Sequence, residues 1–169
     1  MKLTLVFSTG GGIVSRAIRW FTRSRCSHVM IGLSLFDQDV LLHSTAGGVQ
    51  FTFPRSKWFR NERLIAEYEI IPDLSAGVPI LLEKFLNAHY DYVGVVGGFP
   101  LVLLWRRWFK KKIRNPLASP TALFCSEFVL HLDEGGRIPE WKGLDPERTH
   151  AQDLLEICET SRSFIRVQR

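Results

Sequence analysis

Three residues of this sequence have side chains suited to nucleophilic chemistry: Cys125, His28 and His43. Cys125 lies in a Phe-Cys-Ser-Glu-Phe segment near the start of a predicted helix, where the positive end of the helix dipole favours a thiolate. A thiol nucleophile needs a base within hydrogen-bonding reach and a group that orients the base, and the two histidines lie on successive predicted strands. Taken alone, the same residues also fit a buried structural cysteine, one hydrogen-bonded core histidine and one surface histidine.

Two other uses of such residues compete with a nucleophilic site. Cys26, His28, His43 and Cys125 would supply four zinc ligands, but their spacings match no common zinc pattern. Three glycines at positions 10–12 follow a predicted strand and precede a predicted helix. They lack the Lys-Ser/Thr pair and the glycine spacing of a phosphate-binding loop, so we expect a tight turn there.

The elements that must position these residues follow from hydrophobic periodicity and turn signals. We expect strands over 2–8, 27–36, 40–45, 49–53, 64–71 and 164–167, and helices over 13–22, 75–89, 121–133 and 151–160. Ser75 is expected to cap the second helix, with Pro79 in its first turn. Strands joined largely by short turns, with helices at the ends, predict an α+β fold around an antiparallel sheet.

The hairpin that carries both histidines determines whether they meet. With a turn at residues 37–39, paired residues have numbers that sum to about 76, so His28 faces about residue 48 and His43 about residue 33. The two rings become neighbours only if the pairing shifts or bulges by several residues.

Composition and charge limit the class of protein. With 169 residues, 46% hydrophobic and 23% charged, the chain fits one folded domain over residues 1–169 and not a disordered or multi-span membrane protein. The net charge of +5 comes from residues 105–114, which hold six of the 22 basic residues and no acid; the remainder has 16 basic against 17 acidic residues. A uniformly basic nucleic-acid binder is therefore not expected.

An apolar and then basic insertion occupies about residues 93–115. Its features suit a lid or packing element with a solvated basic edge, or an interfacial membrane segment; a nucleic-acid contact ranks third. The residues expected to contact a membrane or partner are Trp105, Arg106, Arg107, Trp108, Lys110, Lys111 and Lys112.

The apolar runs are too short for a signal peptide or a spanning helix, so we expect a cytoplasmic or peripheral membrane protein. Three cysteines, an odd and low number, argue against a disulfide framework and suit a reducing compartment. Cys26 and Cys158 are expected to be structural.

The order of these motifs resembles a known family. The segment SHVMIGL, a strand with His43 followed by Gly-Gly-Val at 47–49, Tyr-Asp-Tyr at 90–92, and finally FCSEF resemble the permuted NlpC/P60 group of papain-like cysteine hydrolases. This group includes the YiiX-like and the lecithin:retinol acyltransferase-like proteins. In it the histidine strand precedes the cysteine helix, as it does here over roughly residues 1–160.

The resemblance implies a permuted papain-like fold, with an antiparallel sheet or half-barrel packed against the helix of the nucleophile. It implies that Cys125 is the nucleophile, His28 the general base and His43 the third, orienting residue. Tyr90 and Asp91 match a family position after the helix and are candidates for substrate binding, although packing and turn formation fit them at least as well. Glu127, two residues beyond the thiol, is expected to be structural.

The implied activity is hydrolysis of an amide, such as a peptide, an isopeptide or a cell-wall peptide, through a thioacyl intermediate. Hydrolysis or transfer of a lipid ester or thioester at a membrane is the alternative, and a non-catalytic, membrane-associated binding module is a further one. The expected partner is an amide- or ester-bearing substrate. No metal, organic cofactor or nucleic acid is expected to be required.

Overall fold

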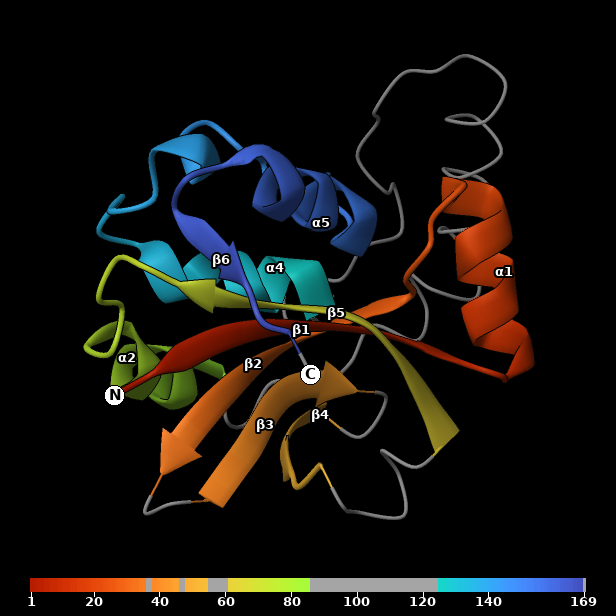
Figure 1. Cartoon of the computed structure of the whole chain (residues 1–169), viewed down its shortest axis with the longest axis horizontal. Helices are drawn as coiled ribbons and strands as arrows, with labels where there is room; N and C mark the ends of the chain where they lie inside the picture. Colours follow the sequence, from red (N-terminus) through yellow and green to blue (C-terminus); the bar gives the residue numbers. More distant parts are fainter. Residues whose placement is uncertain (36–37, 46–47, 55–60, 86–124, 169) are drawn as a thin grey trace.

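The fold is built on one antiparallel sheet of six strands in the order β4-β3-β2-β1-β5-β6 (Figure 1). The computed structural model describes residues 1–35, 38–45, 48–54, 61–85 and 125–168. The strands are β1 (Leu3–Gly10), β2 (His28–Leu35), β3 (Gln38–Thr45), β4 (Gly48–Thr52), β5 (Glu62–Ile70) and β6 (Phe164–Arg166). The predicted α+β class with an antiparallel sheet is therefore confirmed.

Helices gather on one side and at the ends of this sheet. They are α1 (Ile13–Thr22), α2 (Gly77–Phe85), α4 (Cys125–Leu130) and α5 (Ala151–Thr160), with single 3₁₀ turns η3 (His131–Asp133) and η4 (Pro139–Trp141). Figure 1 shows α4 and α5 on the same side of the sheet and α1 at one end of it. Helix α4 packs against β2 and β3, the two strands that carry the histidines.

The main core lies between the sheet and these helices because alternate strand residues face it. Phe7 of β1 and Ile31 of β2 are fully buried there together with Phe128 of α4 and Leu154 of α5. A smaller cluster consists of Val6, Met30 and Leu41, which occupy the alternate positions of the same strands. The centre of the sheet is thus covered on both faces, which holds β2 and β3 in place.

Two predicted helices differ from their observed bounds. Helix α2 begins at Gly77 and not at Ser75, because the Ser75 amide donates to the Asp73 carboxylate in a preceding turn. Ser75 lies two residues before Gly77 and is therefore not the N-cap of α2. Pro79 does lie in the first turn of the helix, as expected.

The helix that carries Cys125 ends earlier than expected. Of the predicted span 121–133, α4 ends at Leu130 and continues as the 3₁₀ turn η3; residues 121–124 lie outside the described part. The Asp133 carboxylate accepts hydrogen bonds from the Arg137 and Ile138 amides, and Gly136 has a φ of 63°. These bonds turn the chain back and end the helical segment.

Candidate active site

The two histidines meet at the side-chain level. His28 Nε2 lies 3.0 Å from His43 Nδ1, a hydrogen-bonding distance, and the rings are tilted by 75° with centroids 5.2 Å apart. His43 is fully buried, whereas His28, the first residue of β2, is partly buried. The structure thus joins the two histidines that the family resemblance pairs.

The register of the β2–β3 hairpin explains this contact. Ile31 pairs with Leu42, so paired residues have numbers that sum to 73. Our expected sum of about 76 was wrong, because β3 begins at Gln38, inside the segment predicted as a turn. One further step along the ladder brings His43 beside Met30, whose neighbour on the same face is His28. Diagonal pairs of this kind are within reach of aromatic side chains.

A third side chain, Thr52, extends the pair across the sheet. His43 Nε2 lies 2.9 Å from Thr52 Oγ1, and Thr52 is 9% exposed. Both ring nitrogens of His43 are therefore within hydrogen-bonding distance of a described side chain. Thr52 was not predicted from the sequence, because a threonine in a strand is common and carries no functional signal.

Burial keeps both rings neutral. Removal from water and, to a smaller extent, the neighbouring His43 together lower the pKa of His28 from its ordinary value of 6.5 to about 3. Burial likewise lowers the pKa of His43 to about 4. Each imidazole therefore carries a single N–H at neutral pH, as a general base must before it accepts a proton.

Cys125 lies beside the strand that begins with His28. It is partly buried, and burial raises the pKa of its thiol, while hydrogen bonds from backbone amides, that of Val29 first among them, oppose the rise. Val29 is the residue directly after His28. Among the described residues no direct hydrogen bond joins the sulfur to the His28 ring; catalytic contacts of this kind are often long before substrate binds.

The other two cysteines are buried, and burial raises the pKa of their thiols as well, that of Cys26 to about 11. All three cysteines are free thiols. Cys125 is the most accessible of them, since it alone is not fully buried.

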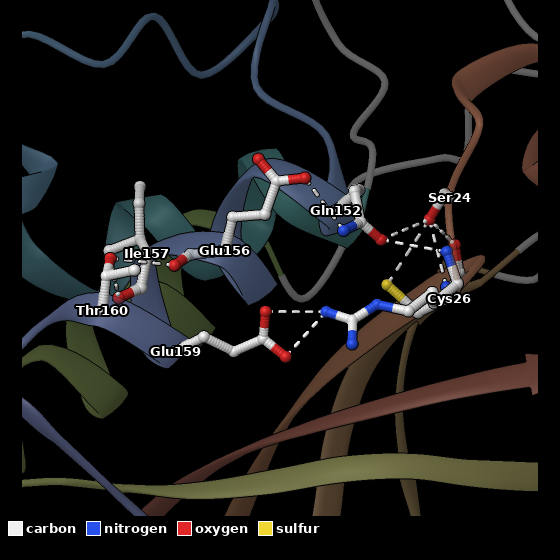
Figure 2. Close-up of polar contacts among 8 residues, drawn as sticks. Ser24, Cys26, Gln152, Glu156, Ile157, Glu159 and Thr160 are labelled. Atoms are coloured by element: carbon white, nitrogen blue, oxygen red, sulfur yellow. Dashed lines mark hydrogen bonds and ion pairs between the residues drawn. The ribbon is translucent and has the colours of Figure 1, made fainter.

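The turn that leads into β2 is anchored to α5 (Figure 2). Gln152 Oε1 accepts hydrogen bonds from the Ser24 hydroxyl at 3.1 Å and from the Arg25 amide at 2.9 Å. The Arg25 guanidinium forms a two-pronged ion pair with Glu159 at 2.6 and 2.7 Å. These contacts fix the chain three and four residues before His28.

A further polar pair lies across the ladder from His28. Ser8 of β1 pairs with His28 in register and is fully buried, and its hydroxyl donates to Glu62 Oε2 at 2.8 Å. Burial raises the pKa of Glu62. Ser8 and Glu62 were not identified from the sequence. With His28, His43 and Thr52 they form a polar row with one member on each of five adjacent strands.

Several predicted site residues lie outside the described part of the chain. They are Tyr90, Asp91 and the insertion at about 93–115, which includes Trp105, Arg106, Arg107, Trp108, Lys110, Lys111 and Lys112. Glu127 lies in the first turn of α4. Within the described ranges, no helix is both long and apolar enough to cross a membrane.

The zinc-site and phosphate-loop alternatives can be compared with the described residues. Among the residues that the structure describes, no three His, Cys, Asp or Glu side chains are grouped as ligands of one metal ion, so the zinc arrangement is not formed there. Gly10 ends β1 and Gly12 precedes α1, with the Gly10 amide donating to Ser15 Oγ at 3.0 Å. This is the expected turn between strand and helix.

No protein-family model matches the chain, and no curated protein matches it by sequence.

Proposed function

We propose that the protein is a cysteine hydrolase that cleaves an amide bond through a thioacyl intermediate on Cys125. The observation that carries the proposal is the His28–His43 pair, with ring nitrogens 3.0 Å apart, at the start of strand β2, against which the helix of Cys125 packs. A nucleophile, a neutral base and an orienting group are the three components that this chemistry requires.

In the first step the sulfur attacks the carbonyl carbon while the thiol proton passes to His28 Nδ1, the ring nitrogen that the His43 contact does not engage. The C–S bond forms as the carbonyl oxygen takes the negative charge. Backbone amides beside the sulfur, such as that of Cys125, are suited to donate to this oxyanion. His28 then gives its proton to the departing amine, and the C–N bond breaks.

In the second step water attacks the thioacyl carbon. His28 accepts a proton from this water, the C–S bond breaks, and the thiolate recovers its proton from His28 as the acid is released. His43 accepts the His28 Nε2–H throughout and so stabilises the imidazolium that forms in each half-reaction.

The proposal is tested by trapping the intermediate. The full chain is incubated with p-nitrophenyl acetate, an activated acyl donor, and with a panel of acyl-amino-acid p-nitroanilides. Acid-quenched protein is then digested, and the mass of each cysteine-containing peptide is measured by mass spectrometry. We expect a stoichiometric acyl adduct on Cys125, with none on Cys158. Conversion of Cys125 to Ser should abolish the thioacyl adduct, and His28→Gln should slow its formation about 100-fold or more.

Equal and slow acylation of all three cysteines, unchanged by His28→Gln, would contradict the proposal. That result would favour the binding-module alternative, which predicts that Cys125→Ala leaves the biological role intact. Turnover of esters without turnover of any amide would instead favour the ester or acyl-transfer alternative.

A further inference from the structure

We infer that Thr52 is a positioning residue of this site, whose hydroxyl selects the tautomer of His43 and, through His43, the ring nitrogen of His28 that can accept the thiol proton. The inference deepens the proposed function and rests on it for its catalytic meaning. The hydrogen-bonded chain itself is a property of the folded sheet.

The geometry puts the three side chains on one face of three neighbouring strands. Leu41 pairs with Thr52 and His43 pairs with Gln50 across β3 and β4. Because alternate strand residues share a face, Thr52 is a diagonal neighbour of His43. The His28 Nε2–His43 Nδ1 and His43 Nε2–Thr52 Oγ1 distances of 3.0 and 2.9 Å complete an unbroken chain.

Counting protons along this chain allows two arrangements. In the first, His28 carries its proton on Nε2 and donates it to His43 Nδ1. His43 must then carry its own proton on Nε2, where it is donated to Thr52 Oγ1. His28 Nδ1 has a lone pair in this arrangement and is competent to take the thiol proton.

In the second arrangement every donor is reversed. Thr52 donates to His43 Nε2, His43 donates from Nδ1 to His28 Nε2, and His28 carries its proton on Nδ1. That nitrogen then has no lone pair for the thiol proton, so the base is inactive. The two arrangements differ in the direction of hydrogen-bond donation along the three side chains. The Thr52 hydroxyl ends the chain, and it can act either as acceptor or as donor.

The reaction favours the arrangement in which Thr52 accepts. When His28 becomes an imidazolium, it must donate from Nε2 to His43 Nδ1, and hydrogen bonds from charged donors are stronger than neutral ones. This requires the His43 proton on Nε2, facing Thr52. A valine at position 52 removes that acceptor, and burying an N–H against a methyl group is strongly disfavoured. The His43 proton is then expected to move to Nδ1, which drives His28 into its inactive tautomer.

The experiment reads the tautomers directly. The full-length protein is labelled with ¹⁵N-histidine, and long-range ¹H–¹⁵N correlation spectra are recorded at about pH 7, where both rings are neutral. Signals are assigned with His28→Gln and His43→Gln. In the unsubstituted protein we expect both rings to be protonated on Nε2. In Thr52→Val we expect the His28 proton on Nδ1, and in Thr52→Ser the original pattern.

Thr45→Val is the matched control, since the Thr45 hydroxyl binds the Gly48 carbonyl at 3.2 Å and does not belong to the chain; its spectrum should equal that of the unsubstituted protein. The acylation rate of Cys125 by p-nitrophenyl acetate should fall about 10- to 100-fold in Thr52→Val and recover in Thr52→Ser.

A His28 proton on Nδ1 in the unsubstituted protein would overturn the inference, and this measurement does not depend on the folding of the Thr52 variants. So would an unchanged His28 tautomer in folded Thr52→Val. The spectra need no substrate, so the two proposals fail separately. Tautomers that respond to Thr52 without any acyl adduct on Cys125 would support the Thr52 assignment and overturn the proposed function.

Discussion

Cys125 and His28 are both held in their neutral forms, because burial raises the pKa of the thiol and lowers that of the imidazole to about 3. A thiolate–imidazolium pair formed before substrate binds would place two charges in this poorly hydrated region, which burial disfavours. Under the proposed function, the proton therefore passes from sulfur to His28 during the attack. The Val29 backbone amide opposes part of the rise in the pKa of the thiol.

This distribution of charge predicts how Cys125 reacts with an alkylating agent. The rate of its carboxamidomethylation by iodoacetamide should rise steadily with pH through about pH 9, because the thiolate fraction stays small below the raised pKa. Peptide mass spectrometry follows each cysteine separately. Cys158 is buried in the folded protein and serves as the internal control. Its peptide should be modified only when the protein is unfolded in denaturant. A constant, high rate between about pH 5 and 8 would instead indicate a preformed ion pair.

The lowered histidine pKa values also predict a loss of stability in mild acid. The unfolded chain takes up a proton on His43 as the pH falls below the ordinary value of 6.5, whereas the folded protein does not until about pH 4. The stabilisation is therefore complete above about pH 6.5 and is lost as the pH falls towards 4, by up to about 1.4 kcal/mol per pH unit for this group.

Urea unfolding at several values between about pH 5 and 7 measures this effect. The slope of the unfolding free energy against pH should be smaller in His43→Gln than in the unsubstituted protein, since one titrating group has been removed. Identical slopes would show that His43 is not held neutral by the fold.

At the scale of elements, close contacts between backbones set where the helices lie. A Cβ atom added to Gly77, the first residue of α2, would lie 2.2 Å from the backbone oxygen of Leu132 in η3. Because a backbone oxygen cannot move aside as a flexible side chain can, α2 can approach η3 this closely only with glycine. This approach connects α2 to the segment that follows α4.

Substitution of Gly77 by alanine should therefore destabilise the protein by about 2 kcal/mol or more, as expected for overpacking against fixed atoms. The measurement is the midpoint of urea unfolding. Gly12→Ala is the matched control, since Gly12 also lies at a helix start, as the N-cap of α1, but has no atom within 4 Å of an added Cβ. Equal effects of the two substitutions would contradict this account.

At the scale of the whole molecule, the last strand closes the core. Strand β6 pairs with β5 along residues 68–70, and Phe164 packs 6.0 Å from Trp141, measured between ring centroids. Phe164 belongs to the same buried cluster as residues of β1, β2, α4 and α5. After α5 the chain therefore returns to the sheet and adds β6 at its edge, beside β5.

Removal of residues 164–169 should cost about 3 kcal/mol or more of unfolding free energy, because it deletes a buried phenylalanine, and should promote association through the exposed edge of β5. Urea unfolding and light scattering measure the two effects. Ile165→Thr is the control, since Ile165 is 57% exposed, and it should change stability by no more than about 0.5 kcal/mol. A monomeric truncated chain of unchanged stability would contradict this prediction.

Much of this organisation could be predicted from local sequence. The spans of α1 and α5 are confirmed, and the predicted strands each correspond to an observed strand within about three residues at either end. The prediction works because side-chain periodicity and turn residues act over a few positions along the chain. The candidate residues Cys125, His28 and His43 could be named for the same reason, since thiol and imidazole chemistry belongs to the residue type.

What could not be predicted is how these residues meet. A shift of three in the sum of paired numbers, from about 76 to 73, decides whether His28 and His43 are neighbours. That register depends on packing over the whole sheet and not on the turn signal alone. Thr52, Ser8 and Glu62 joined the site for the same reason, because strands distant in sequence place them in one row. The sequence by itself determined which groups could do chemistry; the tertiary structure decided which of them touch and, through burial, which stay neutral.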